Sequence, residues 1–277
     1  MSILSGLQSD PVGTLILLLY RAPAVLIALT LHELSHGYVA LRCGDPTAKM
    51  LGRLTFNPLK HLDPIGTVFM FLFGFGWARP VPVNPRNYKH FRRDDLLVSL
   101  AGVTMNFLLF VFATLLMVGV NELLWTAETW TLGDLTARQD FLRFDGWNFR
   151  SIYSGMNDLF IRTASGGGAY YLEGLYPYLK TPWLLYVQRF LMNFTSINLS
   201  LAIFNLLPIP PLDGYHVVND IFLRGKLHIP ARAMNTIMIG LMVVFYATHF
   251  LSDWLGQAVY WVQGGVVSGV LAIFGLG

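Results

Sequence analysis

The longest apolar segments of the chain constrain its fold more than any other feature. The segment Asp95–Val120 carries one charged residue, at its first position, and further apolar segments occupy Ala22–Leu41, Trp183–Leu207 and Ala233–Leu251. A helix needs about 20 apolar residues to cross the hydrocarbon core of a bilayer, and its backbone hydrogen bonds are then satisfied internally. We therefore predict an all-α polytopic membrane protein with about five to six transmembrane helices.

The amino-acid composition supports this class and excludes an ordinary soluble domain. Hydrophobic residues make up 54% of the 277-residue chain and charged residues 13%, whereas charged residues make up about 25% of typical soluble domains. The sequence pI is near 9.0, but the basic residues flank the apolar segments. We attribute them to membrane topology and expect no nucleic-acid partner. The single cysteine, Cys43, excludes an intrachain disulfide.

Two stretches are predicted to differ from simple membrane-crossing helices. Val12–Tyr20 is apolar but is followed by Arg21 and Pro23, which predicts an interfacial helix ahead of a first span at Ala22–Leu41. The apolar run Ile65–Trp77 is too short to span as a helix. It leads into a segment interrupted by Pro80, Pro82 and Pro85, so we expect a re-entrant loop or a short β-hairpin there.

The remaining segments suggest one membrane domain over residues 1–277, with an insertion at about 121–182. Leu212–Leu223 is a short segment after the proline break, and Trp254–Phe274 could be a final span. Twelve lysines and arginines fall within 42–93 and 224–232, against five within 121–182. Because cytoplasmic loops carry the excess of basic residues, the first two ranges are predicted to be cytoplasmic and the insertion extracytoplasmic.

A metal-binding motif lies inside the first predicted span. His32, Glu33 and His36 form the pattern HExxH, and helix positions four residues apart share one face. Two neutral imidazoles at this spacing can bind one zinc ion, and the adjacent carboxylate can act as general base. In a soluble helix, two solvated histidines would explain the pattern equally well. At bilayer depth an acidic residue costs roughly 2.5–3.5 kcal/mol, so Glu33 requires a partner or a function.

Asp213 is the candidate for a third metal ligand. It follows the proline-rich end of the third long apolar segment, and Gly214 permits an unusual turn beside it. A catalytic zinc site commonly has three protein ligands and one open position, and zinc would offset the cost of burying the carboxylate. The alternative is that Asp213 only caps the short helix that begins near Gly214.

Four motifs together resemble the site-2 protease family of intramembrane zinc metalloproteases. They are HELSH (His32–His36), NLLPIPPLDG (Asn205–Gly214), FNPLKHLDPIGT (Phe56–Thr67) and GWARPVPVNPRN (Gly76–Asn87). The last two are similar to the compact bacterial and archaeal branch of that family. The resemblance covers about residues 22–120 and 183–250, in matching order.

The resemblance implies one Zn²⁺ ion per chain, bound by His32, His36 and Asp213, with Glu33 as the catalytic carboxylate. It also places Asn106 and Asn205 near the site, where either side chain could bind a substrate oxyanion; interhelical hydrogen bonding would explain both equally well. The implied substrates are single-span membrane proteins in a bacterial or archaeal cell membrane, cleaved toward the cytoplasmic side. The segment 121–182 is short for the PDZ domain found in many members, and we expect no CBS domain. The oligomeric state stays open.

Two other classes of protein remain as alternatives. A metal transporter or sensor would also place His and Asp within membrane spans. Transporters, however, favour several exchangeable ligands along a path and often consist of repeated halves, whereas here the candidates converge on one site and no repeat is found. A binding scaffold without catalysis is disfavoured because Glu33 and all three candidate ligands are present.

Overall fold

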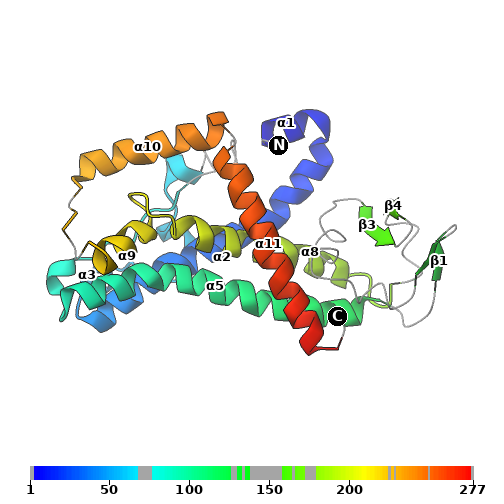
Figure 1. Ribbon diagram of the computed structural model, residues 1–277, viewed down its shortest axis with the longest axis horizontal. Coiled ribbons are helices and arrows are strands. Elements are labelled where there is room, and N and C mark those ends of the chain that lie inside the picture. The colour runs from blue at the N-terminus through cyan, green and yellow to red at the C-terminus, as the bar shows by residue number, and fades with distance from the viewer. Residues whose placement is uncertain are drawn as a thin grey trace.

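The structure is a computed structural model that describes residues 3–67, 77–125, 130–132, 135–137, 158–163, 166–171, 179–223, 226–227, 229–248 and 250–275. It is mostly helical, and Figure 1 shows the long helices gathered in one body, with the short strands to one side. The helices are α1 (Ile3–Ser9), α2 (Pro11–Cys43), α3 (Thr47–Met50), α5 (Phe91–Leu124), α8 (Leu184–Asn205), α9 (Asp213–Ile221), α10 (Ala231–Thr248) and α11 (Phe250–Ile273), with two 3₁₀ turns, η1 (Pro58–Lys60) and η2 (Pro85–Asn87).

Within the described residues, α2 and α5 are the two helices long and apolar enough to cross a membrane by length and composition. The start of α2 is set by Asp10, whose side chain accepts a hydrogen bond from the Gly13 amide at 2.9 Å. Its end is set by Gly44, which adopts a left-handed conformation with φ of 112°, as glycine does readily at this position. The membrane class inferred from the sequence is therefore supported, while the larger number of spans is not established by these two helices.

The separate interfacial helix predicted at Val12–Tyr20 is wrong. In the structure α2 is continuous through Arg21 and Pro23, from Pro11 to Cys43. A proline inside a helix removes one backbone hydrogen bond and strains the preceding turn. The long apolar stretches on both sides keep helical geometry in spite of that cost, so Pro23 does not divide the helix.

Helices α2, α5 and α8 pack side by side and form the centre of the molecule, and α11 lies across α5 and α8 (Figure 1). The largest fully buried apolar side chains among the described residues come from these four helices: Phe110, Met117, Leu124, Leu185, Leu199 and Leu271. The short helix α9 packs against α5. Helix α5 thus contacts both α2 and α9, although these two helices are far apart along the chain.

The segment Ile65–Asn87 is described only in part, because residues 68–76 lie outside the described range. The prediction of a re-entrant loop or hairpin at this segment therefore stays a prediction. Before and after residues 68–76, Leu62 and Ala78 form an isolated antiparallel bridge, and the Arg79 amide donates to the His61 carbonyl at 2.8 Å. The chain just before Ile65 is thus paired with the chain that follows Trp77.

The insertion after α5 contains four short strands, which corrects the prediction of an all-α fold to a mostly helical one. β1 (Trp130–Leu132) pairs antiparallel with β2 (Leu135–Ala137), and β3 (Asp158–Thr163) pairs with β4 (Gly166–Tyr171), with Asp158 opposite Tyr171. The insertion begins and ends at the same point, because Trp125 and Leu179 form a bridge. Short strands rich in aromatic and β-branched residues give a much weaker sequence signal than long apolar helices.

Candidate metal centre

The two histidines of the HExxH motif lie on one face of α2, as their spacing predicts. The His32 and His36 rings meet edge to face with centroids 4.7 Å apart, and their Nε2 atoms are 3.0 Å apart. Nδ1 of His36 lies 2.7 Å from the Val98 carbonyl on α5. A proton on Nδ1 donated to that carbonyl leaves the lone pair on Nε2, which is the atom directed at the centre of the site.

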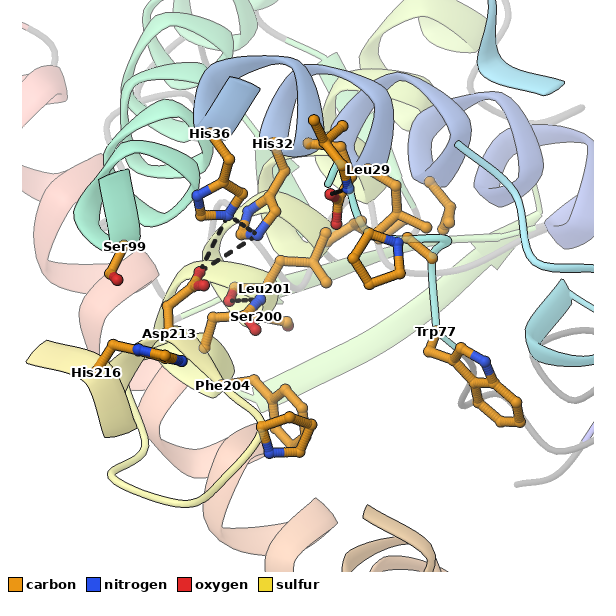
Figure 2. A pocket seen from close by; sticks show the side chains of 18 of the residues that line it. Leu29, His32, His36, Trp77, Ser99, Ser200, Leu201, Phe204, Asp213 and His216 are labelled. Atoms are coloured by element: carbon orange, nitrogen blue, oxygen red, sulfur yellow. Dashed lines mark hydrogen bonds and ion pairs between the residues drawn. The ribbon is translucent and has the colours of Figure 1, made fainter. Parts of the chain in front are cut away.

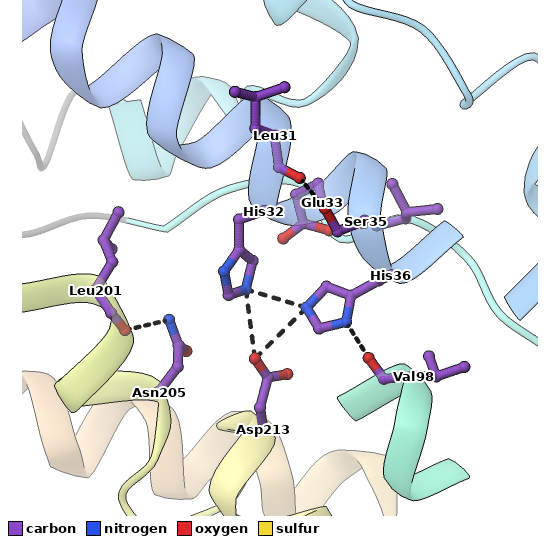
Figure 3. Close-up of polar contacts among 10 residues, drawn as sticks. Leu31, His32, Glu33, Ser35, His36, Val98, Leu201, Asn205 and Asp213 are labelled. Carbon is purple, nitrogen blue, oxygen red and sulfur yellow. Dashed lines mark hydrogen bonds and ion pairs between the residues drawn. The ribbon is translucent and has the colours of Figure 1, made fainter. Parts of the chain in front are cut away.

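Asp213 reaches the same point from the beginning of α9. Its Oδ2 atom lies 3.4 Å from His32 Nε2 and 3.5 Å from His36 Nε2. Figure 3 shows the carboxylate pointing up from α9 toward the two imidazoles of α2. The N-cap of α9 is Leu212, and no side chain makes a cap hydrogen bond there. The alternative that Asp213 only caps this helix is therefore wrong.

Gly214 allows the chain to place Asp213 in this way. A Cβ atom at this position would clash with the backbone of Leu206 and Leu207, so the turn after α8 folds back against the start of α9 only with glycine present. Gly102 plays a similar part on α5. A Cβ atom there would lie 2.6 Å from His32 Nε2 and would also clash with the His36 ring, so α5 can lie directly against the two imidazoles.

The three side chains fit a metal ion. His32, His36 and Asp213 each offer one ligand atom, and these atoms all lie within 4.8 Å of one another. In a tetrahedral zinc site with ligands at about 2.0–2.2 Å, neighbouring ligand atoms are about 3.3–3.6 Å apart, and the separations observed here lie between 3.0 and 3.5 Å. Asp213 Oδ2 is buried without a hydrogen-bond partner among the described residues. A cation between the three groups would satisfy it.

Glu33 is held beside this site by the chain segment that follows residue 76. Its side chain is 8% exposed, and its Oε2 atom accepts a hydrogen bond from the Val81 amide at 2.8 Å. The Arg53 guanidinium donates to the carbonyls of Arg79 at 2.8 Å and Pro80 at 3.1 Å. Arg53 thus holds the two residues that precede Val81. The Val81 amide in turn holds one oxygen of the Glu33 carboxylate in place.

Asp45 fixes the same segment on its other side. The buried Asp45 carboxylate accepts hydrogen bonds from the Asn84 amide at 2.7 Å and from Asn87 Nδ2 at 2.7 Å, and also from Thr47. Burial raises the pKa of Asp45, but these hydrogen bonds outweigh burial and hold the pKa below its ordinary value. The carboxylate therefore stays ionised and keeps the segment in place across the neutral pH range.

A cavity of about 720 Å³ opens onto the site. His32, Glu33 and His36 line it from α2 and Asp213 lines it from α9, while a row of residues on α8 forms another wall. Figure 2 shows His216 and Ser99 on the side of Asp213, and Trp77 at some distance from the imidazoles. The cavity is large enough for a short peptide segment and provides the candidate metal ligands with an accessible side.

The structure separates the two asparagines predicted to lie near the site. Asn205 lines the cavity, and its Nδ2 atom donates to the Leu201 carbonyl of its own helix at 3.0 Å. Asn106 is fully buried on α5 and is not part of the cavity lining. Neither polar atom of its side chain has a hydrogen-bond partner among the described residues. The two residues are therefore not brought together.

Sequence reasoning missed Val81, Val98, Asp95 and Asp220 around the site, whereas the position of His216 three residues past Asp213 already suggested a polar lining residue. The Val81 amide and the Val98 carbonyl act through their backbone, which leaves no signal in residue type. Asp95 on α5 lies 3.6 Å from His216 on α9, measured from Oδ2 to Nδ1, and both line the cavity. Asp220, one helical turn beyond His216, is nearly buried; burial and the neighbouring Asp95 raise its pKa to about 6. Their i, i+4 spacing on a short helix is a weak signal that could have drawn attention to them.

The sequence of the chain is similar to those of known proteins. The family model of peptidase family M50 matches residues 20–248, which include both motifs of the candidate site. The candidate zinc metalloprotease YwhC of Bacillus subtilis (strain 168) is 33% identical over 242 residues, covering 87% of this chain and 84% of that protein. The candidate zinc metalloprotease Rip2 of Mycobacterium tuberculosis (strain ATCC 25618 / H37Rv) is 25% identical over 245 residues, covering 86% and 70%. No solved structure matches the chain.

Proposed function

This chain belongs to peptidase family M50 and is a zinc metalloprotease, and on that premise we propose that it hydrolyses peptide bonds within or near transmembrane segments of other membrane proteins. One observation carries the proposal: His32 and His36 on α2 meet Asp213 from α9 at metal-binding distances, with Glu33 beside them. The apolar character of α2 supports a reaction that takes place below the surface of the membrane.

The residues have distinct roles in this mechanism. His32, His36 and Asp213 would hold the zinc ion, which when bound polarises a peptide carbonyl and lowers the pKa of a coordinated water toward about 7. Glu33 would take a proton from the attacking water on its carboxylate and deliver it to the nitrogen of the leaving amine. The Val81 amide holds Oε2 of Glu33 at 2.8 Å, so the orientation of the carboxylate is set before a substrate arrives.

Asn205 is the better supported of the two candidates for binding the developing oxyanion. It lines the cavity, and an amide donor directed at a developing negative charge can stabilise it. Its present hydrogen bond to Leu201 would have to be exchanged for one to the substrate. The burial of Asn106 outside the cavity lining favours a role in helix packing.

We further propose that α8, α10 and α11 cross the membrane together with α2 and α5. These helices would give five spans, the lower of the two numbers predicted from the sequence. The basic residues within 42–93 and 224–232 support a cytoplasmic position for the ends of the helices nearest the site. The insertion at about 121–182 would then be extracytoplasmic, in a bacterial or archaeal cell membrane. Substrates of this enzyme would be single-span membrane proteins that unwind locally before cleavage.

A pair of variants tests the proposed function in purified protein reconstituted into lipid vesicles. Glu33→Gln should retain zinc, measured by metal analysis, and should lose cleavage of single-span test proteins by about 10²- to 10⁴-fold. Asp213→Ala should lose both zinc and cleavage, because one of three ligands is removed. A transporter would instead keep metal flux across the vesicle membrane in Glu33→Gln, and that result would contradict the proposal.

A further inference from the structure

The cavity extends well beyond the candidate metal site, along the groove between α2 and α8. On α2 its lining residues recur on one helix face, from Leu18 and Arg21 through Val25 and Leu29 to His32. On α8 the lining runs from Asn193 to Asn205. The spacing of three, four or seven residues keeps each row on one face of its helix. The cavity is therefore an elongated groove with the metal ligands at one end and Arg21 near the other.

Arg21 is an unusual residue to find at the far end of this groove. Its Nε atom donates to Asn193 Oδ1 at 3.4 Å, which is a long hydrogen bond. Within the described parts of the chain, no carboxylate forms an ion pair with Arg21. A charged residue in a membrane helix is costly and is commonly paired or functional, and the guanidinium has five N–H donors for bidentate recognition of a carboxylate. Most of those donors are available to a ligand in the groove.

The charges along the groove are separated. Glu33, Asp95 and Asp213 lie at the metal end, and Arg21 lies at the other end among apolar and uncharged polar lining residues. At the metal end the carboxylates already face the candidate metal ligands, His216 or the Val81 amide, so an acidic side chain of a substrate segment would find its cationic partner at Arg21. The groove therefore favours one register of such a segment over the others, because charge complementarity selects orientation and position.

The distance between the two ends can be expressed in substrate residues. Arg21 precedes His32 by eleven positions on the continuous helix α2, and the helical rise of 1.5 Å per residue places them about 16 Å apart. A peptide in extended conformation advances about 3.3 Å per residue. A side chain that contacts Arg21 would thus belong to a residue about five positions from the peptide bond at the metal site.

We propose that Arg21 is a specificity-determining residue that binds the carboxylate of an aspartate or glutamate about five residues from the cleaved bond of the substrate. This inference rests on the proposed function, because it assumes that an extended membrane-protein segment occupies the groove. It goes further by naming a chemical feature of the substrate. Arg21 is exposed, but it lines the same groove as Glu33 and the candidate metal ligands, so the proposed partner is the substrate carboxylate rather than a lipid phosphate.

The test uses the full-length protein and a single-span test protein in phosphatidylcholine vesicles, prepared without and with increasing fractions of anionic phosphatidylglycerol. An Asp or an Asn is placed in turn at each position on both sides of the cleaved bond, which mass spectrometry identifies. We expect kcat/KM for the Asp substrate to exceed that for the Asn substrate by at least about tenfold at one position near five residues from the bond, the lower end of the contribution of a charge-assisted hydrogen bond.

Charge reversal separates recognition from a structural role. In Arg21→Glu the preference should invert, so that a Lys at that position is cleaved faster than an Asp, while zinc content stays unchanged. Arg21→Lys should keep part of the preference. Arg42→Gln is the matched control, because Arg42 lies at the end of the same helix, bonded to Tyr38, and is not part of the groove lining. It should leave the preference intact.

Binding to the Glu33→Gln variant provides a readout that does not need cleavage. Its Kd for the Asp substrate should be at least about tenfold lower than for the Asn substrate. If this preference holds but wild-type protein cleaves neither substrate, the proposed function fails and the Arg21 assignment stands. The assignment is overturned if Arg21→Glu slows all substrates equally, or if rates follow the fraction of anionic lipid in the vesicles and not the charge of the substrate.

Discussion

The two ends of the groove differ in how completely their polar groups are fixed by the protein. At the metal end, His36 is bonded to the Val98 carbonyl, Glu33 to the Val81 amide, and both imidazoles lie against Asp213. At the other end, Arg21 has one hydrogen bond to another described side chain, at 3.4 Å to Asn193. The comparison suggests that the chemistry is preorganised, whereas the groups that recognise the substrate keep their donors available until it binds.

The largest expected effect comes from a substitution at the metal end of the groove, where Gly102 of α5 lies against the His32 and His36 rings. Gly102→Ala should abolish zinc binding and cleavage, because the added Cβ clashes with both imidazoles. Gly119→Ala on the same helix is the matched control, since a Cβ there meets nothing within 4 Å. Metal analysis and a cleavage assay on both variants check the prediction. Zinc retained at the wild-type level in Gly102→Ala would contradict the packing described here.

A smaller effect is expected when the orientation of Glu33 is disturbed and the candidate ligands are left alone. Val81→Pro removes the amide hydrogen that Oε2 of Glu33 accepts, so kcat should fall by about 10- to 100-fold with zinc content unchanged, in the range of a lost hydrogen bond to a charged group. Val81→Ala keeps the amide and serves as the control for loss of the side chain. Equal losses in the two variants would show that the hydrogen bond is unimportant.

The smallest effect is expected at Asp220, outside the groove, and it concerns stability. Burial, together with Asp95, raises the pKa of Asp220 from 3.8 to about 6, so the folded protein binds this proton more tightly than the unfolded chain. The stabilisation is present at low pH and is lost as the pH rises through about 6. Asp220→Asn should therefore raise Tm at pH 7.5 by roughly 2–4 °C.

The same substitution should have little effect near pH 4, where the carboxyl group is protonated in the folded protein. Asp253→Asn, at an exposed position at the start of α11, is the control and should leave Tm unchanged at both pH values. Thermal unfolding in detergent, followed by circular dichroism, measures all three proteins. A lower Tm for Asp220→Asn at pH 7.5 would contradict a strained, ionised carboxylate at this position.

The long helices and the candidate metal ligands were predictable because their signals are carried by residue type and spacing. Apolar residues over more than 20 positions specify helices in a membrane, and His32 with His36 is a local pattern on one helix. The structure confirms that Asp213 lies close to both histidines. This proximity could be anticipated because an acidic residue at membrane depth needs a partner.

Other features depend on the path of the chain and could not be read from residue types. The continuity of α2 through Pro23 runs against the helix-breaking tendency of proline, and the strands β1 to β4 have only weak local signals. The Val81 amide reaches Glu33 because Asp45 and Arg53 hold the segment between them. Any residue except proline offers that amide, so no sequence pattern marks it.

The central claim is that His32, His36 and Asp213 bind one zinc ion together, and X-ray absorption spectroscopy of the purified zinc-loaded protein tests it most directly. The account predicts about one zinc per chain, with two imidazole nitrogens and oxygen ligands at about 2.0–2.2 Å. Asp213→Ala should lose the ion or show a changed oxygen shell. An unchanged spectrum and full zinc content in Asp213→Ala would contradict the proposed site.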